Sequence, residues 1–300
     1  MKMHKIIFAA LSLSVLMIAC SGRVVDKTVQ DTVVDDYSRT VVVPVSPTRV
    51  VSLSPAVTEI IYALHAENLL VGRTDFCLYP PEASQIPSIG GISNLNVERI
   101  VSLQPDLVIS GSMVGKKVTD QMDQMGIPMV CVIEKPRFDA LYDNILAIGR
   151  LVNKSDEADS LVLTLKKRYQ ALLSQDTVAT FSSTSGPAPK VYYVVGFGPG
   201  GNFTAGGNTF INDIISMAGG HNIAEKVSCW SFSLESLVQE DPDFIIVRRE
   251  DSAAFCSMKP YTGLSAVRTG HVIGIESGTL DLQVPRNLDA IVYLRNRMSL

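Results

Sequence analysis

The chain has 300 residues, of which 46% are hydrophobic and 19% are charged. This composition is sufficient for packed cores and excludes an intrinsically disordered protein, and the length suggests about two domains. The formal net charge of −4 provides no basic stripe of the kind that nucleic-acid binding needs, so nucleic acid is not an expected partner.

Residues 1–19 are predicted to be a lipoprotein signal peptide. A lysine-containing start precedes the apolar stretch 6–18, which is shorter than the roughly 20 residues that span a bilayer. The stretch ends in Met17-Ile18-Ala19-Cys20, which resembles a bacterial lipobox. We therefore expect an exported protein that acyl chains on Cys20 hold to a bacterial membrane, on its periplasmic or cell-surface side. The alternative is an ordinary secretory signal in which Cys20 is incidental.

The first α/β series follows a polar segment. Residues 20–40 lack helical periodicity and are predicted to form a lipid-anchored tether. From Val50 on, short β-branched runs alternate with amphipathic stretches, which is typical of a parallel sheet. In this N-terminal lobe, residues 41–154, the expected strands are 50–53, 69–72, 107–109 and 129–133, and the expected helices are 56–66, 96–103, 116–126 and 138–152.

A long helix is expected next, over residues 155–175. Ser155 is a favourable N-cap, Asp156 and Glu157 follow in the first turn, and apolar side chains recur at steps of three or four residues. A polar loop then leads into a second α/β series, the C-terminal lobe of residues 176–300. Its expected strands are 191–195, 244–247 and 272–275, and its expected helices are 209–218, 233–240 and a final one from about 287.

An internal repeat relates the two series. Residues 96–109 align without gaps on residues 233–246, at an offset of 137 that places Glu98 on Glu235. Each copy reads as an N-cap, a short helix, a Pro-Asp turn and a buried strand. The predicted fold class is therefore α/β, with two similar Rossmann-like lobes bridged by a single long helix and a ligand cleft between the lobes.

Signatures of enzymes and metal sites are weak. Residues 196–201 match GxGxxG after a strand, but Pro199 and the glycines that follow prevent the helix start that a dinucleotide site requires. The histidines at 65, 221 and 271 are far apart, so no metal site, no catalytic residue and no cofactor are expected. An exported enzyme on a doubly wound fold is the remote alternative.

The cysteines other than Cys20 match no zinc or redox spacing. Cys229 and Cys256 fall in predicted loops of the same lobe, so one disulfide is an option. Small buried free thiols are the alternative for these two cysteines and for Cys77 and Cys131.

Residues directly after strands are the candidate ligand contacts, because ligands on open α/β sheets bind beyond the carboxyl ends of the strands. The chain's single tryptophan, Trp230, lies in a loop before a repeated helix, where an aromatic side chain serves either packing or binding. The candidates are Ser54, Pro55, Phe76, Tyr79, Phe197, Phe203, Trp230, Phe232 and Arg286.

Several segments in order resemble the substrate-binding proteins of ABC importers for cobalamin, ferric siderophores and haem. These segments are residues 49–60, 79–83, 96–101, 105–109 and 218–222, and the likeness extends over about residues 40–300. The Tyr-Pro-Pro segment and Trp230 are most similar to cobalamin-binding members. The resemblance implies two lobes on one helical strut, a permease with a separate ATPase as partner, and no chemistry by the chain itself.

The resemblance also implies roles for particular residues. Glu98 and Glu235 would dock on permease arginines, which is compatible with a stabilising effect of about 0.3–1 kcal/mol at each helix N-terminus. A docking glutamate must face solvent without an internal cationic partner. The residues implied to contact the ligand are Tyr79, Trp230, Phe197 and Arg286.

The expected ligand is cobalamin or a related corrinoid. A ferric siderophore or haem bound by the same kind of protein is the alternative. Siderophore complexes are usually anionic, and this chain offers Arg73, Arg137 and Arg286 as possible donors to them.

Overall fold

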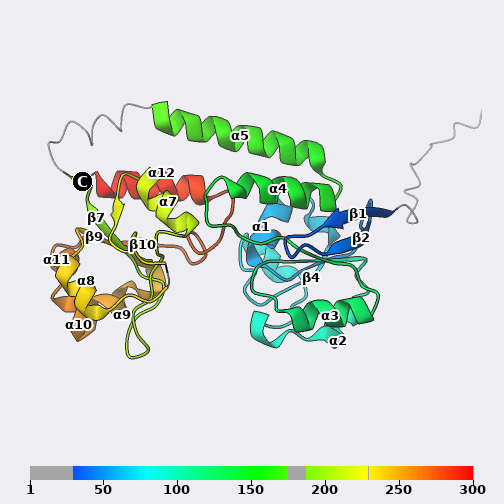
Figure 1. Ribbon diagram of the computed structural model, residues 1–300, viewed down its shortest axis with the longest axis horizontal. Helices are drawn as coiled ribbons and strands as arrows, with labels where there is room; N and C mark the ends of the chain where they lie inside the picture. The colour runs from blue at the N-terminus through cyan, green and yellow to red at the C-terminus, as the bar shows by residue number, and fades with distance from the viewer. Residues whose placement is uncertain (1–29, 175–186, 229, 300) are drawn as a thin grey trace, which may run out of the picture.

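The computed structural model describes residues 30–174, 187–228 and 230–299. The predicted signal peptide, Cys20 and the first part of the predicted tether lie outside these residues. Two α/β lobes lie side by side, and the long helix α5 extends over both of them (Figure 1). The predicted fold class is confirmed.

The N-terminal lobe is built on a parallel sheet with the strand order β4-β3-β5-β6. Its strands are short and each contains valine, and the residues of β3 and β5 are fully buried, because helices cover the sheet. The elements are β3 Val50–Ser52, α1 Pro55–Ala63, β4 Leu70–Arg73, α2 Val97–Ser102, β5 Leu107–Ser110, α3 Lys116–Gln124, β6 Met129–Cys131 and α4 Ala140–Leu151.

The C-terminal lobe repeats this plan with the strand order β10-β9-β7-β8, again parallel. Short helices follow β9, and the last helix, α12, returns beside α7 beneath α5 (Figure 1). The elements are β7 Lys190–Tyr193, α7 Phe210–Met217, β8 His221–Asn222, α8 Leu234–Glu240, β9 Phe244–Arg248, α9 Ser252–Ser257, α10 Lys259–Thr262, α11 Ser265–Arg268, β10 Val272–Ile275 and α12 Asn287–Met298.

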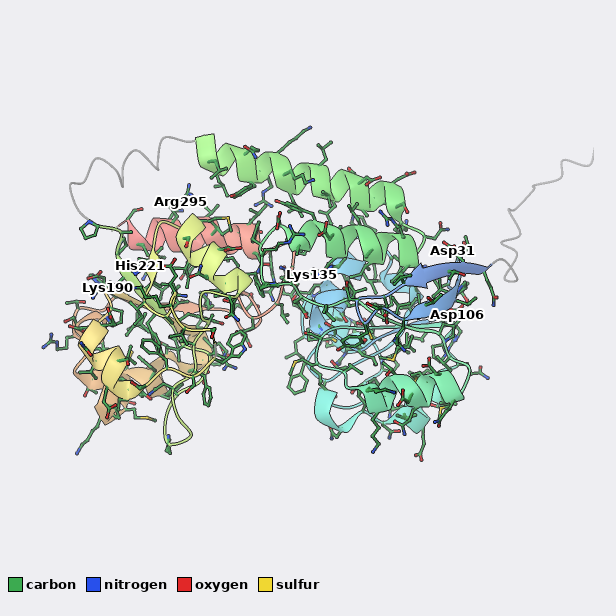
Figure 2. The ribbon with its side chains drawn as sticks, in the orientation of Figure 1. Asp31, Asp106, Lys135, Lys190, His221 and Arg295 are labelled. Atoms are coloured by element: carbon green, nitrogen blue, oxygen red, sulfur yellow. The ribbon has the colours of Figure 1, made fainter. Side chains whose placement is uncertain are left out.

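The Pro-Asp turns of the internal repeat have the same structural task in both lobes. Asp106 accepts a hydrogen bond from the backbone N–H of Arg49 at 2.9 Å, just before the first strand of its sheet. Asp243 accepts one from the backbone N–H of Lys190 at 2.7 Å, at the start of β7. Figure 2 labels Asp106 and Lys190 in their separate lobes. The repeated aspartates therefore fasten each turn to the first parallel strand of its lobe.

Helix α5, Ser155–Ser174, forms where the sequence predicts it and contacts both lobes. Its apolar face buries Ala158, Val162 and Leu165 in a core cluster that also contains residues of α4, α7 and α12. Arg295 of α12 donates a hydrogen bond to the carbonyl oxygen of Leu172 at 2.9 Å. The two lobes therefore share one continuous apolar layer.

The predicted tether is wrong from Gln30 onward. Strand β1, Gln30–Val34, pairs antiparallel with β2, Thr40–Pro44. The side chain of Asp35, beside the turn, is fully buried and accepts hydrogen bonds from Arg39 Nη2 at 2.7 Å and from the Cys131 backbone N–H at 3.2 Å. The polar residues of this segment favoured a tether, but its valines pair in a hairpin. The buried Asp35 attaches this hairpin to the edge of the first sheet.

Asp35 should make the fold sensitive to acid. Burial raises the pKa of Asp35, but the hydrogen bonds with Arg39 and the Cys131 backbone, together with the charge of Arg39, outweigh burial and leave the pKa below its ordinary value. A lowered folded-state pKa gives stability that is present above the unfolded value of about 3.9 and is lost as the pH falls below it. We expect Asp35→Asn to lower the free energy of unfolding at neutral pH by about 1–3 kcal/mol and to weaken its acid dependence.

Urea unfolding at neutral pH and below about pH 4 measures both effects. Asp31→Asn, at an exposed position of the same hairpin, is the matched control and should change little. An Asp35→Asn variant with wild-type acid dependence would contradict this role.

Candidate functional site

A cavity of about 480 Å³ lies between the two lobes. It is placed beyond the carboxyl ends of strands, since Ser54 follows β3, Gly111 follows β5, Glu134 follows β6 and Arg248 ends β9. This is the expected location of a ligand on open α/β sheets, here contributed by both lobes at once. The full lining is Leu53, Ser54, Pro55, Phe76, Ile92, Gly111, Ser112, Met113, Glu134, Phe210, Arg248, Asp281 and Leu282.

The walls of this cavity are mainly apolar. Phe76 and Met113 are 58% and 74% exposed, so two large apolar side chains of the N-terminal lobe are left open to solvent. Phe210 and Leu282 of the C-terminal lobe also line the cavity. Exposed apolar surface inside a cleft is typical of a ligand-binding groove, because a ligand is what removes it from water.

Carboxyl groups are present on both sides of the cavity. Ser112 Oγ donates a hydrogen bond to Glu134 at 2.5 Å, and the Tyr193 hydroxyl donates one to Asp281 at 2.5 Å. Burial raises the pKa of Tyr193 well above its ordinary value, and the neighbouring carboxylate acts in the same direction. The tyrosine therefore remains protonated and holds Asp281 in place as a donor.

Among the described residues that line the cavity, Arg248 is the one basic residue. Its Nη2 donates to the carbonyl oxygen of Val195 at 2.6 Å, and its Nε lies 3.4 Å from a carboxylate oxygen of Asp251. The guanidinium of Arg248 therefore connects Val195, which follows β7, with Asp251, which follows β9.

Three of the residues that follow predicted strands line the cavity, namely Ser54, Pro55 and Phe76. Glu134 and Arg248 also follow strands, so the same rule applied to every strand would have found them. Asp281 lies in a long loop after β10 and had no such signal.

The four residues implied to contact the ligand lie outside this lining. Phe197 is half-buried and packs edge-to-face on Phe255 and Tyr261, with ring centroids 5.3 and 6.0 Å away, so its place is in the core of its own lobe. Trp230 is 49% exposed, and its carbonyl accepts a hydrogen bond from the Thr204 N–H at 2.8 Å. About half of this side chain is therefore open to solvent.

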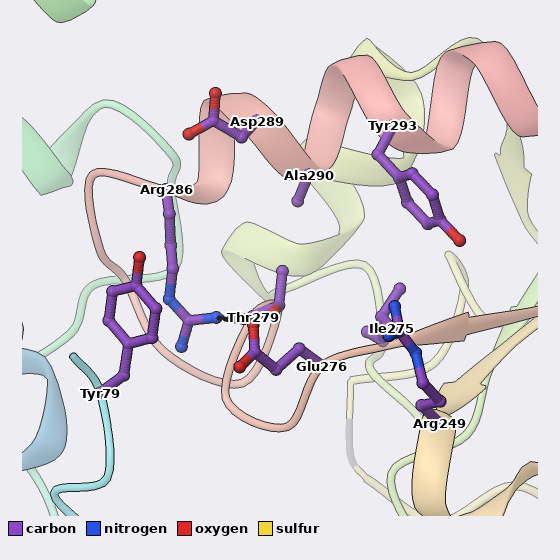
Figure 3. A pocket seen from close by; sticks show the side chains of 9 residues that line it. All are labelled: Tyr79, Arg249, Ile275, Glu276, Thr279, Arg286, Asp289, Ala290 and Tyr293. Atoms are coloured by element: carbon purple, nitrogen blue, oxygen red, sulfur yellow. Dashed lines mark hydrogen bonds and ion pairs between the residues drawn. The ribbon is translucent and has the colours of Figure 1, made fainter. Parts of the chain in front are cut away.

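Arg286 and Tyr79 form part of the junction between the lobes. The Arg286 guanidinium makes two 2.8 Å hydrogen bonds to the carboxylate of Glu59 in α1, and it lies 4.4 Å from the centre of the Tyr79 ring. Figure 3 shows that ring against the guanidinium and Thr279 on its other side. Glu59 accepts from Nε and Nη2 of Arg286 and Thr279 accepts from Nη1, so these donors already have internal partners, and the role of Arg286 as a ligand contact stays a prediction.

A second buried contact lies at the same junction. Gln283 is fully buried, accepts a hydrogen bond from Asn144 Nδ2 at 3.1 Å and donates to the carbonyl oxygens of Arg137 at 2.8 Å and Lys135 at 3.2 Å. Figure 2 shows Lys135 between the lobes. Because these three hydrogen bonds of the buried Gln283 amide all cross to the opposite lobe, separation of the lobes would cost them, and the two lobes behave as one unit.

Glu98 and Glu235 are both exposed. Within the part of the chain that the structure covers, neither has an ion-pair partner. Their helices are capped by other residues: Asn96 accepts a hydrogen bond from the Arg99 N–H at 2.9 Å, and Ser233 accepts one from the Ser236 N–H at 2.9 Å. The two glutamates are therefore available to an external partner.

The remaining sequence motifs have structural places. In the segment 196–201 the Gly198 N–H donates to the Tyr261 hydroxyl at 2.9 Å, and the next helix starts only at Phe210. Cys77 and Cys131 are buried thiols, whereas Cys229 lies outside the described residues. In those residues no group of three His, Cys, Asp or Glu is placed to hold a metal ion, and no helix has the length and apolarity to cross a membrane.

Comparison with known proteins identifies the family. A cobalamin-binding protein of Halobacterium salinarum is 31% identical over 263 residues, which cover 83% of this chain and 69% of that protein. A Bacillus subtilis protein named an ABC transporter substrate-binding lipoprotein is 27% identical over 315 residues, covering 98% of this chain and 96% of that protein. A periplasmic haem-binding protein from Pseudomonas aeruginosa superimposes with a TM-score of 0.76 at 26% identity, covering 83% of this chain and 91% of that one.

The profile of the periplasmic binding protein family matches residues 50–279. This match spans both lobes and the helix between them. The chain therefore belongs to the periplasmic binding protein family, whose members bind solutes for ABC importers and are not enzymes.

Proposed function

We propose that this protein captures cobalamin or a related corrinoid between its lobes and delivers it to the permease of an ABC importer, which a separate ATPase drives. The protein would be exported and anchored through lipid on Cys20, on the periplasmic or cell-surface side of a bacterial membrane. The observation that carries the proposal is the apolar cavity of about 480 Å³ at the strand ends of both lobes. Its size lies within the roughly 300–1,000 Å³ typical of small-molecule sites.

A flat, largely apolar macrocycle fits such walls, because Phe76 and Met113 offer apolar surface that binding would remove from water. The similarity to a protein named as cobalamin-binding supports the corrinoid as the ligand. Haem is the second candidate, since a protein named as haem-binding has the same fold at 26% identity. A ferric siderophore is the third candidate of the same class.

Titration calorimetry of residues 21–300, prepared without lipid, tests the ligand. Cyanocobalamin, haemin and ferric siderophores are compared under identical conditions. We expect cyanocobalamin to bind with a Kd of about micromolar or tighter, that is about −8 kcal/mol or more favourable. Absence of binding at that concentration would refute the corrinoid and leave the family membership intact.

Two aromatic side chains should contribute to affinity. We expect Phe76→Ala to weaken ligand binding by roughly tenfold to a hundredfold, because the phenyl ring lines the cavity and is 58% exposed without ligand. Trp230→Ala should weaken binding by a similar factor if its exposed indole covers the bound ligand from the C-terminal lobe. Calorimetry with cyanocobalamin measures both.

Leu163→Ala is the control for these variants, because Leu163 is an exposed apolar residue of α5 away from the cavity. Its affinity should equal that of the wild type. Unchanged affinity in Trp230→Ala would assign the tryptophan to packing only.

A further inference from the structure

The interlobe cavity contains two carboxyl groups that have no basic ion-pair partner among the residues that the structure describes. Glu134 comes from the N-terminal lobe and Asp281 from the C-terminal lobe. Each accepts a hydrogen bond of 2.5 Å from a hydroxyl group, and in the described parts of the chain neither has an ion-pair partner. A carboxylate has several acceptor sites, so both groups keep acceptor capacity for a ligand.

The basic groups that could balance them are already in use. Arg248 lines the cavity, but its guanidinium donates to a backbone carbonyl at 2.6 Å and lies 3.4 Å from the carboxylate of Asp251. No lysine is found among the described residues that line the cavity. The net charge offered to a ligand is therefore negative, with one carboxyl group from each lobe.

The three arginines that could serve an anionic ligand are also engaged within the protein. Arg73 is buried and donates to three backbone carbonyl oxygens. Arg137 forms two 2.8 Å ion pairs with aspartates, and Arg286 is paired with Glu59. Recruiting any of them for a ligand would cost the internal contacts that they make.

We propose that Glu134 and Asp281 select ligands whose periphery carries N–H donors, such as primary carboxamides, and reject ligands with peripheral carboxylates. This inference rests on the proposed function, because it concerns the ligand of the same cavity. An amide N–H forms a charge-assisted hydrogen bond to a carboxylate, whereas a ligand carboxylate at the same place is repelled. The corrin ring of cobalamin carries carboxamides, haem carries propionates, and many ferric siderophore complexes are anionic.

The test compares two corrins that differ only in the groups at the ring edge. Dicyanocobinamide carries amides, and dicyanocobyrinic acid carries carboxylates in their place. We expect the wild-type protein to bind the amide form at least roughly a hundredfold more tightly. Glu134→Gln and Asp281→Asn should each reduce this ratio roughly tenfold, chiefly by improving binding of the acid.

Both substitutions keep a carbonyl oxygen that accepts the hydrogen bond from the hydroxyl of Ser112 or Tyr193. The fold should therefore be retained, and thermal unfolding of each variant checks this. Glu67→Gln, at an exposed glutamate of the N-terminal lobe outside the cavity, is the matched control and should leave the ratio unchanged. A wild-type preference for the acid, or a ratio that neither cavity variant changes, would overturn the inference.

Failure of the proposed function has a different signature. If neither corrin binds but haem does, the corrinoid is refuted, and haemin and its diamide then provide the same comparison. Preference for the diamide over haemin would support the proposal that Glu134 and Asp281 select amides over carboxylates, with haem in place of the corrinoid. Preference for haemin itself would overturn that selection as well.

Discussion

Transport should be nearly abolished when Glu98 and Glu235 are both replaced by alanine, whereas ligand affinity stays at the wild-type level. Each glutamate is exposed, lacks an internal cationic partner in the described residues, and lies at the equivalent position of its lobe. Removing one charge from a protein interface that pairs it with arginine typically costs at least a tenfold loss in affinity, so the double variant should bind the permease at least roughly a hundredfold more weakly.

The measurements are uptake of labelled ligand, binding to the reconstituted permease and calorimetry with the ligand alone. Glu67→Ala combined with Glu250→Ala is the matched control, because each is an exposed glutamate in the first turn of a short helix, one in each lobe. The control should transport normally. Association of the wild-type proteins should also weaken as salt is added, since exposed charges are screened. Normal uptake by the Glu98 and Glu235 double variant would refute docking through this pair.

Arg286→Met should cost about 3–5 kcal/mol of unfolding free energy at neutral pH. The substitution leaves the carboxylate of Glu59 buried without its cationic partner, and the side chain of Glu59 is only 5% exposed. The double variant Glu59→Met with Arg286→Met should recover much of the loss, because two apolar side chains of similar volume leave no buried charge. Arg137→Met, which breaks ion pairs at more than half-exposed groups, should cost at most about 1 kcal/mol.

The pair of Glu59 and Arg286 predicts that the free energy of unfolding changes with pH in the opposite direction to the change predicted for Asp35. Burial raises the pKa of Glu59 above its ordinary value, although Arg286 opposes the shift. A raised folded-state pKa gives stability that is fully present below the unfolded value of about 4.3 and is lost as the pH rises through the folded pKa. This loss should become steeper in Arg286→Met. Chemical unfolding from about pH 4 upward measures it, and equal slopes in the two proteins would contradict the role of the pair.

Some residues of the cavity can be predicted from the sequence by the rule that ligand contacts follow the ends of strands, and others cannot. Phe76 can be found from the sequence because it comes shortly after the apolar run of residues 69–72, and the same rule points to Glu134 and Arg248, which directly follow the predicted strands 129–133 and 244–247. Asp281 was beyond reach, because a loop of the length that follows β10 has no periodicity from which a direction can be read.

The sequence by itself determined the long helix α5 and the repetition of the lobes. The apolar periodicity of residues 155–174 specifies a helix because local spacing alone decides which face is apolar. The repeat at an offset of 137 residues specifies two related α/β units for the same reason, since each helix, turn and strand is a local pattern. Family membership followed from these local patterns.

Only the tertiary structure decided which polar groups are free to act. Arg286 reads from the sequence as a possible ligand donor, but the fold places it on Glu59, which lies 227 residues earlier in the chain. Glu134 follows a strand and Asp281 has no such local signal, yet the fold places both on one cavity whose basic residue, Arg248, is bonded to Val195 and Asp251. Whether a charge is available depends on partners that are distant in the chain, because electrostatic contacts are set by separation in space and by burial.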